Sequence, residues 1–342
     1  MQYITLGQTG LRVSRTAFGA IPIQRLSESD AVCLLRKAYD AGINFFDTAY
    51  GYTDSETKIG KAFSGAERSK LVLATKTHAK TVYSFWHDLK TSLVRLQTDY
   101  IDLYQFHNPE FIPQPSGDDG LYHAALEAKH QGLIRHIGIT NHDSARVIEA
   151  INSGLYDTVQ FPFSYLASER DLAVVEASRQ HNVGFIAMKA MSGGLLSNAA
   201  AAFAFIRSFE MVVPIWGIEK ECELDEFLSL EETGIVLDTS LQRIIDQDRQ
   251  ELSGFFCRGC GYCLPCPAGI PISIAARMSF LLKRALPSTW QTPVWQENMR
   301  RIRNCTQCGA CAARCPYGLK PYELLKDELD YYEKQLACNN QN

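Results

Sequence analysis

The chain has 342 residues, of which 46% are hydrophobic and 21% are charged, and its formal net charge is −4. This length predicts one large domain with a small one, or two ordinary domains, and the composition is typical of a soluble globular protein. The negative charge argues against a general nucleic-acid binder. Residues 198–206 are the closest candidate for a membrane span, but they fall well short of the roughly 18 apolar residues required. With no secretory signal at the N-terminus, we expect a cytoplasmic protein with neither nucleic-acid nor membrane partners.

Short apolar runs alternate with amphipathic segments from residue 16 to about 230. The segments 27–42, 84–97 and 168–182 have the apolar spacing of surface helices. Eight strand-then-helix units with nearly continuous apolar strands predict the α/β class and a (β/α)8 TIM barrel. Residues 3–14 alternate around a Gly-Gln-Thr-Gly turn and predict a hairpin that closes the bottom of the barrel. The predicted strands are 15–20, 43–49, 70–77, 100–107, 134–140, 157–163, 183–190 and 211–218.

The composition changes after about residue 235, where strand-like runs end and most of the cysteines lie. We therefore predict a barrel domain over 1–235, a helical cysteine-rich domain over 236–336 and an irregular tail over 337–342. Four of the eleven cysteines lie in 257–266 and four in 305–315, and each run ends on Cys-Pro. Clustered cysteines in a cytosolic chain are typical of metal ligands rather than of disulfides.

The second run fits Cys-x2-Cys-x2-Cys-x3-Cys-Pro, the pattern of proteins with two iron–sulfur clusters, and the first run is one residue shorter before its last cysteine. Structural zinc is the alternative, but zinc sites usually pair two separated Cys-x2-Cys units. In two-cluster proteins the fourth cysteine of each run ligates the other cluster. The predicted ligands are therefore Cys257, Cys260, Cys263 and Cys315 for one [4Fe–4S] cluster, and Cys305, Cys308, Cys311 and Cys266 for the other.

Four polar side chains follow three consecutive predicted strands of the barrel. Asp47 and Lys76 end two of these strands, His107 ends the next, and Tyr52 follows Asp47 by five residues. Catalytic groups of such barrels gather at this end of the strands. A tyrosine titrates near about 10 and donates a proton poorly at neutral pH unless a neighbouring ammonium stabilises its phenolate. We therefore predict Tyr52 as a general acid tuned by Lys76 and Asp47, with His107 guiding a carbonyl oxygen.

The sequences "FFDTAYGYTDSE" (45–56), "LATKT" (73–77), "DLYQFH" (102–107), "GITNH" (138–142), "VQFPFSY" (159–165) and "SGGLL" (192–196) resemble the motifs of the aldo-keto reductases. The resemblance covers residues 1 to 230 and implies a hydride-transfer barrel with a nicotinamide cofactor. It places the catalytic tetrad on the four residues named above, and the nicotinamide carboxamide on Asn141 and Gln160. The whole chain resembles the subgroup that carries a C-terminal ferredoxin-like domain with two [4Fe–4S] clusters.

The predicted nucleotide site departs from the family pattern. Met188 stands where many relatives carry an aromatic residue against the nicotinamide, and a thioether can also cover a ring. After Gly217, the residues Glu219 and Glu223 replace the basic residues of relatives that bind a 2′-phosphate. Carboxylates there would repel that phosphate and could accept hydrogen bonds from a ribose diol, although Lys220 lies between them. The sequence favours NAD(H) over NADP(H).

The substrate is predicted only as a small carbonyl or alcohol compound, with Tyr50, Trp86 and Phe111 as apolar walls of its pocket. Residues 257–304 hold seven lysines and arginines but only one acidic residue, Glu297. This stretch is either a solvated helical surface or a docking surface for an acidic electron carrier such as a ferredoxin or flavodoxin. Three functions stay open: a reductase whose clusters transfer electrons, a nicotinamide reductase whose clusters are structural, and a redox-sensing or regulatory nucleotide-binding protein.

Overall fold

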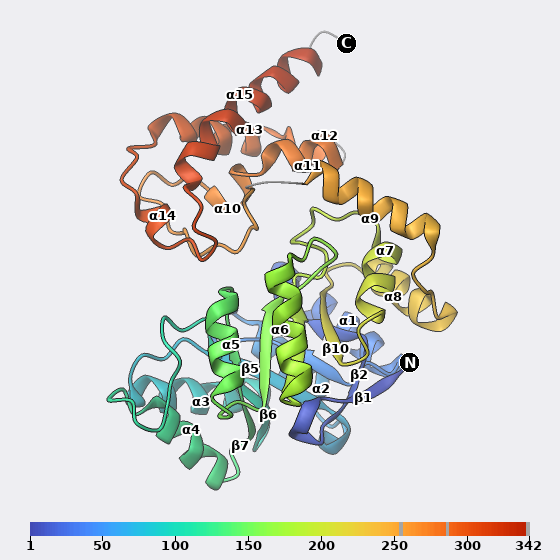
Figure 1. Ribbon diagram of the computed structural model, residues 1–342, viewed down its shortest axis with the longest axis vertical. Coiled ribbons are helices and arrows are strands. Elements are labelled where there is room, and N and C mark those ends of the chain that lie inside the picture. The colour runs from blue at the N-terminus through green and yellow to red at the C-terminus, as the bar shows by residue number, and fades with distance from the viewer. Residues whose placement is uncertain (253–255, 285–286, 340–342) are drawn as a thin grey trace. The chain divides into compact units, whose positions relative to one another are not determined.

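The computed structural model describes residues 1–252, 256–284 and 287–339 (Figure 1). The chain forms two compact units. The first comprises Met1–Ala190 and Ala199–Gln242, and the second comprises Met191–Asn198 and Arg243–Asn342. No helix among the described residues is long and apolar enough to cross a membrane.

The first unit is a closed barrel of eight parallel strands in the order β10-β3-β4-β5-β6-β7-β8-β9. The barrel closes because β10 pairs with both β3 and β9. All eight predicted strands are confirmed, each within its predicted range. Their bounds are β3 Ala17–Gly19, β4 Phe45–Asp47, β5 Val72–Thr77, β6 Ile101–His107, β7 Ile134–Thr140, β8 Thr158–Pro162, β9 Gly184–Met188 and β10 Val212–Gly217.

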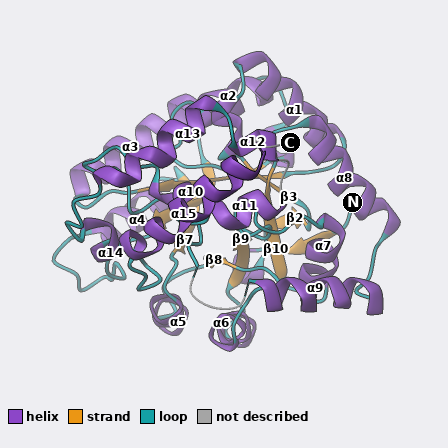
Figure 2. Cartoon of the chain, turned by 90° about the horizontal axis from the view of Figure 1, so that it is seen from above, coloured by secondary structure: helices purple, strands orange, loops and turns teal. Residues whose placement is uncertain are grey.

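Helices surround these strands (Figure 2). Several begin at a residue whose side chain accepts from a free backbone N–H of the first turn. Ser27 caps α1 in this way, and Thr81 and Ser168 form reciprocal capping boxes at α3 and α6. The barrel helices are α1 Glu28–Asp40, α2 Ser55–Phe63, α3 Val82–Leu96, α4 Leu121–His130, α5 Ser144–Asn152, α6 Glu169–Gln180, α7 Ala199–Arg207 and α8 Glu221–Thr233.

The predicted N-terminal hairpin is confirmed as β1 (Tyr3–Thr5) paired antiparallel with β2 (Arg12–Ser14). Leu6 and Val13 are fully buried in one core cluster with residues of β3, β4, β5, β6, β9 and β10. A side chain at Gly7, whose φ is +53°, would overlap the backbone of Gly184 at the start of β9. The hairpin therefore lies against the N-terminal ends of the strands and leaves the carboxyl ends to the polar residues.

The described part of the second unit is helical and contains no strand. Its helices are α9 Thr239–Glu251, which begins in the barrel unit, α10 Ile272–Ala275, α11 Met278–Arg284, α12 Pro287–Trp290, α13 Pro293–Arg300, α14 Ala310–Ala313 and α15 Pro321–Asn339. Helix α15 extends to Asn339, into the predicted tail. Its buried Leu325, Leu329 and Tyr332 repeat at helical spacing and anchor it. Residues 340–342 of that tail lie outside the described residues.

Candidate active site and cysteine centre

The centre of the barrel site is a buried ion pair between Lys76 on β5 and Asp47 on β4. The Lys76 Nζ donates to the Asp47 Oδ2 at 2.5 Å and to the backbone oxygen of Thr48 at 2.6 Å. Gln105 on β6 donates to the other Asp47 oxygen at 3.2 Å. Burial raises the pKa of Asp47 and lowers the pKa of Lys76, and the attraction between them opposes both shifts. These hydrogen bonds therefore fix the position of the Lys76 ammonium inside the barrel.

Tyr52 lies next to this pair, in the turn between β4 and α2. The Lys76 Nζ is 5.3 Å from the centre of the Tyr52 ring. The Tyr52 ring also meets the His107 ring edge to face, with centres 5.7 Å apart and planes at 80°. The structure therefore brings together all four residues of the predicted tetrad.

His107 at the end of β6 is held by a second histidine that the sequence did not single out. The His78 ring stacks on the His107 ring at 4.0 Å with an interplanar angle of 16°. Burial lowers the pKa of His107 well below its usual value, and the neighbouring His78, Lys76 and His142 lower it further. The buried Nδ1 of His107 has no hydrogen-bond partner among the described residues. His107 is thus a neutral imidazole with hydrogen-bonding capacity left for a ligand.

The two predicted carboxamide residues differ in how far the protein already uses them. Gln160 on β8 donates to Asp47, while its buried Oε1 has no partner among the described residues. Asn141 follows β7, where its amide donates to the Pro109 oxygen at 3.0 Å and its oxygen accepts from the Asp143 nitrogen at 2.9 Å. A primary amide requires an acceptor, which Gln160 offers directly. Asn141 has one further donor hydrogen and one further lone pair.

The predicted nucleotide residues lie at β9 and around β10. Met188, the last residue of β9, is half-buried against the barrel core, whereas Gly217, at the end of β10, is exposed. The Glu223 carboxylate accepts from the backbone nitrogens of Glu219 and Lys220 at 2.8 and 3.0 Å, so it caps the start of α8. Part of the negative charge of Glu223 is therefore used within the protein.

Arg25 changes the electrostatics of the same region and was missed in the sequence. It forms an ion pair with Glu219, and its Nε donates to that carboxylate at 2.9 Å. The hydrogen bond from Arg25 lowers the pKa of Glu219. Arg25 stands 194 positions before Glu219 in the chain, so no local pattern points to it. A basic side chain is thus held beside the predicted ribose site by one of the carboxylates that was predicted to repel phosphate.

The three predicted pocket residues lie on separate elements. Tyr50 follows β4, and the Arg95 guanidinium lies 5.0 Å from its ring centre. Trp86 on α3 packs edge to face on Phe85, with ring centres 5.9 Å apart. Phe111, in the segment after β6, is 45% exposed. Their meeting around one substrate stays a prediction.

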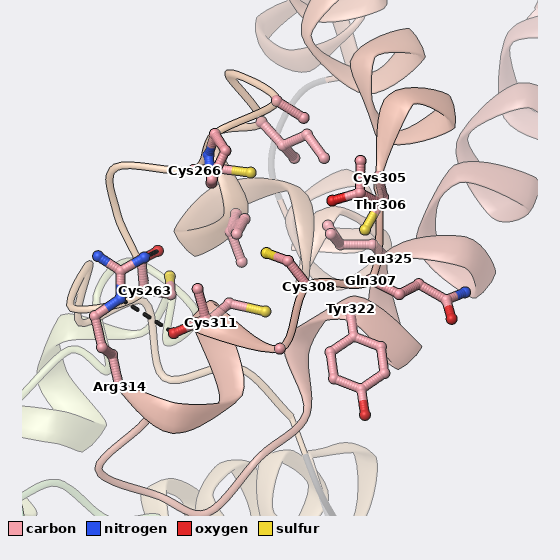
Figure 3. Close-up of a pocket in the computed structure, with 16 residues that line it drawn as sticks. Cys263, Cys266, Cys305, Thr306, Gln307, Cys308, Cys311, Arg314, Tyr322 and Leu325 are labelled. Atoms are coloured by element: carbon pink, nitrogen blue, oxygen red, sulfur yellow. Dashed lines mark hydrogen bonds between the residues drawn. The ribbon is translucent and has the colours of Figure 1, made fainter.

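The second unit contains a cavity lined by cysteines from both runs (Figure 3). Cys266, Cys305, Cys308 and Cys311 all lie around it. These are the four ligands that the cross-ligation rule assigns to one cluster. Cys263 also lines the cavity, beside Pro267, Ile270 and Leu325. Among the described residues, no three cysteine, histidine or carboxylate side chains converge closely enough to hold a single metal ion.

The cysteines assigned to the other cluster also lie near one another. Burial raises the pKa of Cys257, and nearby Cys260 and Cys315 raise it further. Burial, together with Cys257, Cys260 and Cys311, raises the pKa of Cys263 to about 12. Cys315 and Cys311, both from the second run, thus lie near Cys257 and Cys263 of the first run.

Arg314, in the second run, fixes the loop of the first. Its guanidinium donates to the backbone oxygens of Cys263, Leu264 and Pro265 at 3.0, 3.1 and 3.1 Å. The shortened part of the first run is therefore held from outside by three charge-assisted hydrogen bonds. The Arg314 clamp keeps the two cysteine runs together.

Most of the basic residues between 257 and 304 with described side chains are already engaged. Arg300 and Arg301 pair with Glu297, and Arg303 pairs with Glu333. Arg277 is buried, and Lys283 lies 5.5 Å from the centre of the Tyr331 ring. The predicted docking surface for an acidic carrier therefore presents less unpaired charge than the sequence count indicates.

Comparisons with known proteins agree with this division of the chain. The profile of the Aldo/keto reductase family matches residues 15–210, and that of a 4Fe-4S dicluster domain matches residues 256–320. An uncharacterized oxidoreductase of Bacillus subtilis, YrpG, is 33% identical over 230 residues, which cover 58% of this chain and 69% of that protein. L-galactose dehydrogenase of Arabidopsis thaliana is 32% identical over 210 residues, which cover 56% of this chain and 66% of that protein.

A solved structure supports the fold. The aldo-keto reductase AKR11C1 of Bacillus halodurans superposes with a TM-score of 0.63 at 22% identity, over 72% of this chain and 96% of that one. The family match spans more than half of the chain and contains the whole tetrad. The chain is a member of the aldo/keto reductase family, an oxidoreductase barrel followed by a 4Fe-4S dicluster domain.

Proposed function

We propose that the barrel reduces a carbonyl compound, or oxidises the corresponding alcohol, by hydride transfer with a nicotinamide cofactor, and that the second unit carries two [4Fe–4S] clusters for electron transfer. The observation that carries the proposal is the buried Lys76–Asp47 pair beside the Tyr52 ring. A proton donor tuned by a buried ammonium suits a substrate oxygen that gains negative charge.

Tyr52 supplies the proton in this proposal. The carbonyl carbon gains a hydride, the carbonyl double bond becomes single, and the oxygen takes the phenolic proton of Tyr52. The Lys76 ammonium stabilises the phenolate that remains, while Asp47 keeps the lysine charged and in place. In the oxidative direction the phenolate accepts the alcohol proton. The Lys76–Asp47 pair therefore serves both directions.

His107 orients the substrate oxygen. Its lowered pKa keeps the imidazole neutral, so it can donate a hydrogen bond without competing with Tyr52 for the role of acid. The stacked His78 ring limits the rotation of His107. These contacts support a fixed direction of approach for the carbonyl.

The cofactor residues fit a nicotinamide, which when bound would supply the hydride. The unpartnered Oε1 of Gln160 can accept from a carboxamide, and Asn141 can add one further hydrogen bond. Met188 offers a thioether to one face of the ring. Glu219 and Glu223 favour NAD(H), and the Arg25–Glu219 pair sets how strongly they do so. The name of the relative L-galactose dehydrogenase makes sugars the first substrates to test.

The cysteine centre fits two cubanes, which when bound would each exchange single electrons. Cys266, Cys305, Cys308 and Cys311 would hold one, and Cys257, Cys260, Cys263 and Cys315 the other. Two one-electron centres together match the two electrons of one hydride equivalent.

The experiment that tests the proposal measures NADH- and NADPH-dependent carbonyl reduction anaerobically, first with intact clusters and then after mild oxidation. A second arm supplies reduced methyl viologen, a one-electron donor, in place of the nucleotide. Viologen-driven reduction that needs intact clusters would support electron transfer. Nucleotide-driven turnover that is the same before and after cluster oxidation, without any viologen activity, would show structural clusters. The absence of nucleotide binding would contradict the hydride proposal.

A further inference from the structure

The loop between β9 and α7, Met191–Asn198, belongs to the second compact unit although both flanking elements belong to the barrel. It starts three residues after Met188, the predicted nicotinamide contact. Within the loop, the backbone nitrogens of Gly194 and Leu196 donate to the Met191 oxygen at 3.0 and 3.3 Å. The loop follows β9 in the chain.

Arg277, between α10 and α11, binds this loop. The side chain is 7% exposed. Its Nη1 donates to the Gly193 oxygen at 2.9 Å and lies 3.5 Å from the Ser192 oxygen, and its Nε donates to the Ser273 oxygen at 3.1 Å. A buried guanidinium needs such acceptors, because an unsatisfied buried charge is costly.

The guanidinium occupies a slot between two glycines, one in the loop and one in the first cysteine run. A Cβ at Gly259 would lie 2.7 Å from the Arg277 Cζ, and a Cβ at Gly193 would lie 3.2 Å from its Nη1. Both glycines have positive φ, +63° and +65°, which side chains rarely adopt. No other residue type fits either position without moving the guanidinium.

The same guanidinium lies beside predicted cluster ligands. The Cys257 Sγ donates to the Ser273 oxygen at 3.9 Å, and the Arg277 Nε donates to the same oxygen at 3.1 Å. The Cys257 Sγ accepts from the Gly259 nitrogen at 3.4 Å, so Arg277 and this sulfur share Gly259 as a neighbour. The guanidinium thus shares two neighbours, Gly259 and Ser273, with a predicted ligand sulfur and also binds the loop carbonyls. Residues around cluster sulfurs orient the ligands and tune the potential.

We infer that Arg277 is a positioning residue that joins the seat of the first cluster to the β9–α7 loop, holding the loop in place while its charge stabilises the reduced cluster. The inference rests on the proposed clusters. It makes the loop Met191–Asn198, which belongs to the second unit, dependent on the cysteine run.

The experiment compares Arg277→Met and Arg277→Lys with the wild-type holoprotein, and Arg300→Met serves as a matched control at an exposed arginine. Iron is counted in every sample. Hydrogen exchange of 191–198 reports the loop, and a redox titration followed by electron paramagnetic resonance reports the midpoint potential of the first cluster. Lysine keeps the charge but lacks the planar fork that binds two acceptor groups.

With iron retained, Arg277→Met is expected to speed exchange at Gly194 and Leu196 at least tenfold and to make the midpoint potential more negative. Arg277→Lys should speed exchange with a smaller change in potential, and Arg300→Met should change neither. Wild-type exchange rates in Arg277→Met would overturn the inference while leaving the clusters proven by their iron. An unchanged potential in Arg277→Met would overturn the electrostatic half. A wild-type protein without iron would instead refute the proposed clusters.

Discussion

The tetrad of the barrel and the cysteines of the second unit are two redox sites built in opposite ways. Asp47, Lys76 and His107 lie on adjacent strands whose backbones are fixed by the barrel ladder. Their charges are already paired or neutralised by burial. The cysteines lie on loops between short helices, where positive-φ glycines shape the backbone and arginines clamp it.

We expect the two sites to differ in whether they need a cofactor in order to form. The charges of the barrel site are paired or neutralised within the protein, so we expect it to keep its geometry without nucleotide. Burial raises the pKa of Cys257 and of Cys263, the latter to about 12, so these thiols hold their protons in the metal-free protein. Metal binding must remove those protons, and it couples to folding. The second unit should therefore depend on its clusters far more than the barrel does.

The largest expected effect is a loss of carbonyl reduction at the barrel site. Tyr52→Phe removes the proton donor but keeps the ring beside Lys76 and His107. Because a positioned acid contributes about a hundredfold or more, carbonyl reduction should fall by at least that factor. Nucleotide affinity, measured by fluorescence titration, should stay unchanged, as should the iron content. Tyr83→Phe, at an exposed tyrosine on α3, is the matched control. Near-normal turnover of Tyr52→Phe would contradict the assignment of Tyr52.

The next largest effect is a loss of iron from the cysteine centre. Protein purified anaerobically should hold about eight irons and eight acid-labile sulfides per chain. Cys315→Ser should damage the cluster of the first run, because Cys315 lies near Cys257. Cys266→Ser should damage the cluster of the second run, because Cys266 lines the cavity with Cys305, Cys308 and Cys311. Iron content should fall toward about four in each variant.

Low-temperature magnetic resonance would identify which cluster each variant loses. Cys222→Ser, at an exposed cysteine of α8, should keep both clusters. Loss of the cluster local to each mutated run would refute cross-ligation, and zinc in place of iron would refute both clusters. Carbonyl reduction with NADH in the variants would show in addition whether the barrel site survives cluster damage, as the comparison requires.

A smaller effect is expected at the nucleotide site, where charged side chains of the barrel decide between NADH and NADPH. Glu219→Gln should free Arg25 to bind a 2′-phosphate. NADPH affinity relative to NADH should then rise by about fivefold, the equivalent of an exposed ion pair worth about 1 kcal/mol. Glu221→Gln, which breaks a pair between the first residue of α8 and Lys37 of α1, is the matched control. An unchanged ratio in Glu219→Gln would show that Arg25 does not face the ribose.

The sequence predicted what depends on local pattern and missed what depends on distant contacts. Eight apolar runs predicted eight strands, because a parallel strand buried on both faces is apolar nearly throughout. The barrel order then placed Asp47, Lys76 and His107 at neighbouring strand ends. Arg25 and Arg277 were not predicted as site residues, because each binds a segment far away in the chain. Their roles follow from tertiary geometry, which no short motif encodes.

The basic stretch 257–304 shows that a local count of charges also misses distant contacts. Counting charges over 257–304 predicted a surface for an acidic carrier, but Arg303 pairs with Glu333, which lies outside the counted stretch. Burial removes Arg277 from the surface altogether. Docking of an acidic carrier stays a prediction.

The smallest expected effect separates the two regions by pH. Burial lowers the pKa of both His107 and His142 well below the unfolded value near about 6.5, so the unfolded chain binds more protons than the folded one below that pH. Barrel stability must therefore fall as pH falls from 7 to 6, by about 0.7 kcal/mol for each such histidine. His142→Asn removes one share, so its loss over this interval should be smaller than that of the wild type by about 0.7 kcal/mol. Hydrogen exchange of the slowest amides in β6 and β7, corrected for intrinsic rates, measures this opening free energy for the barrel alone. An equal loss in both proteins would contradict the lowered pKa of His142, because burial and the neighbouring Lys189 charge both disfavour its protonated form.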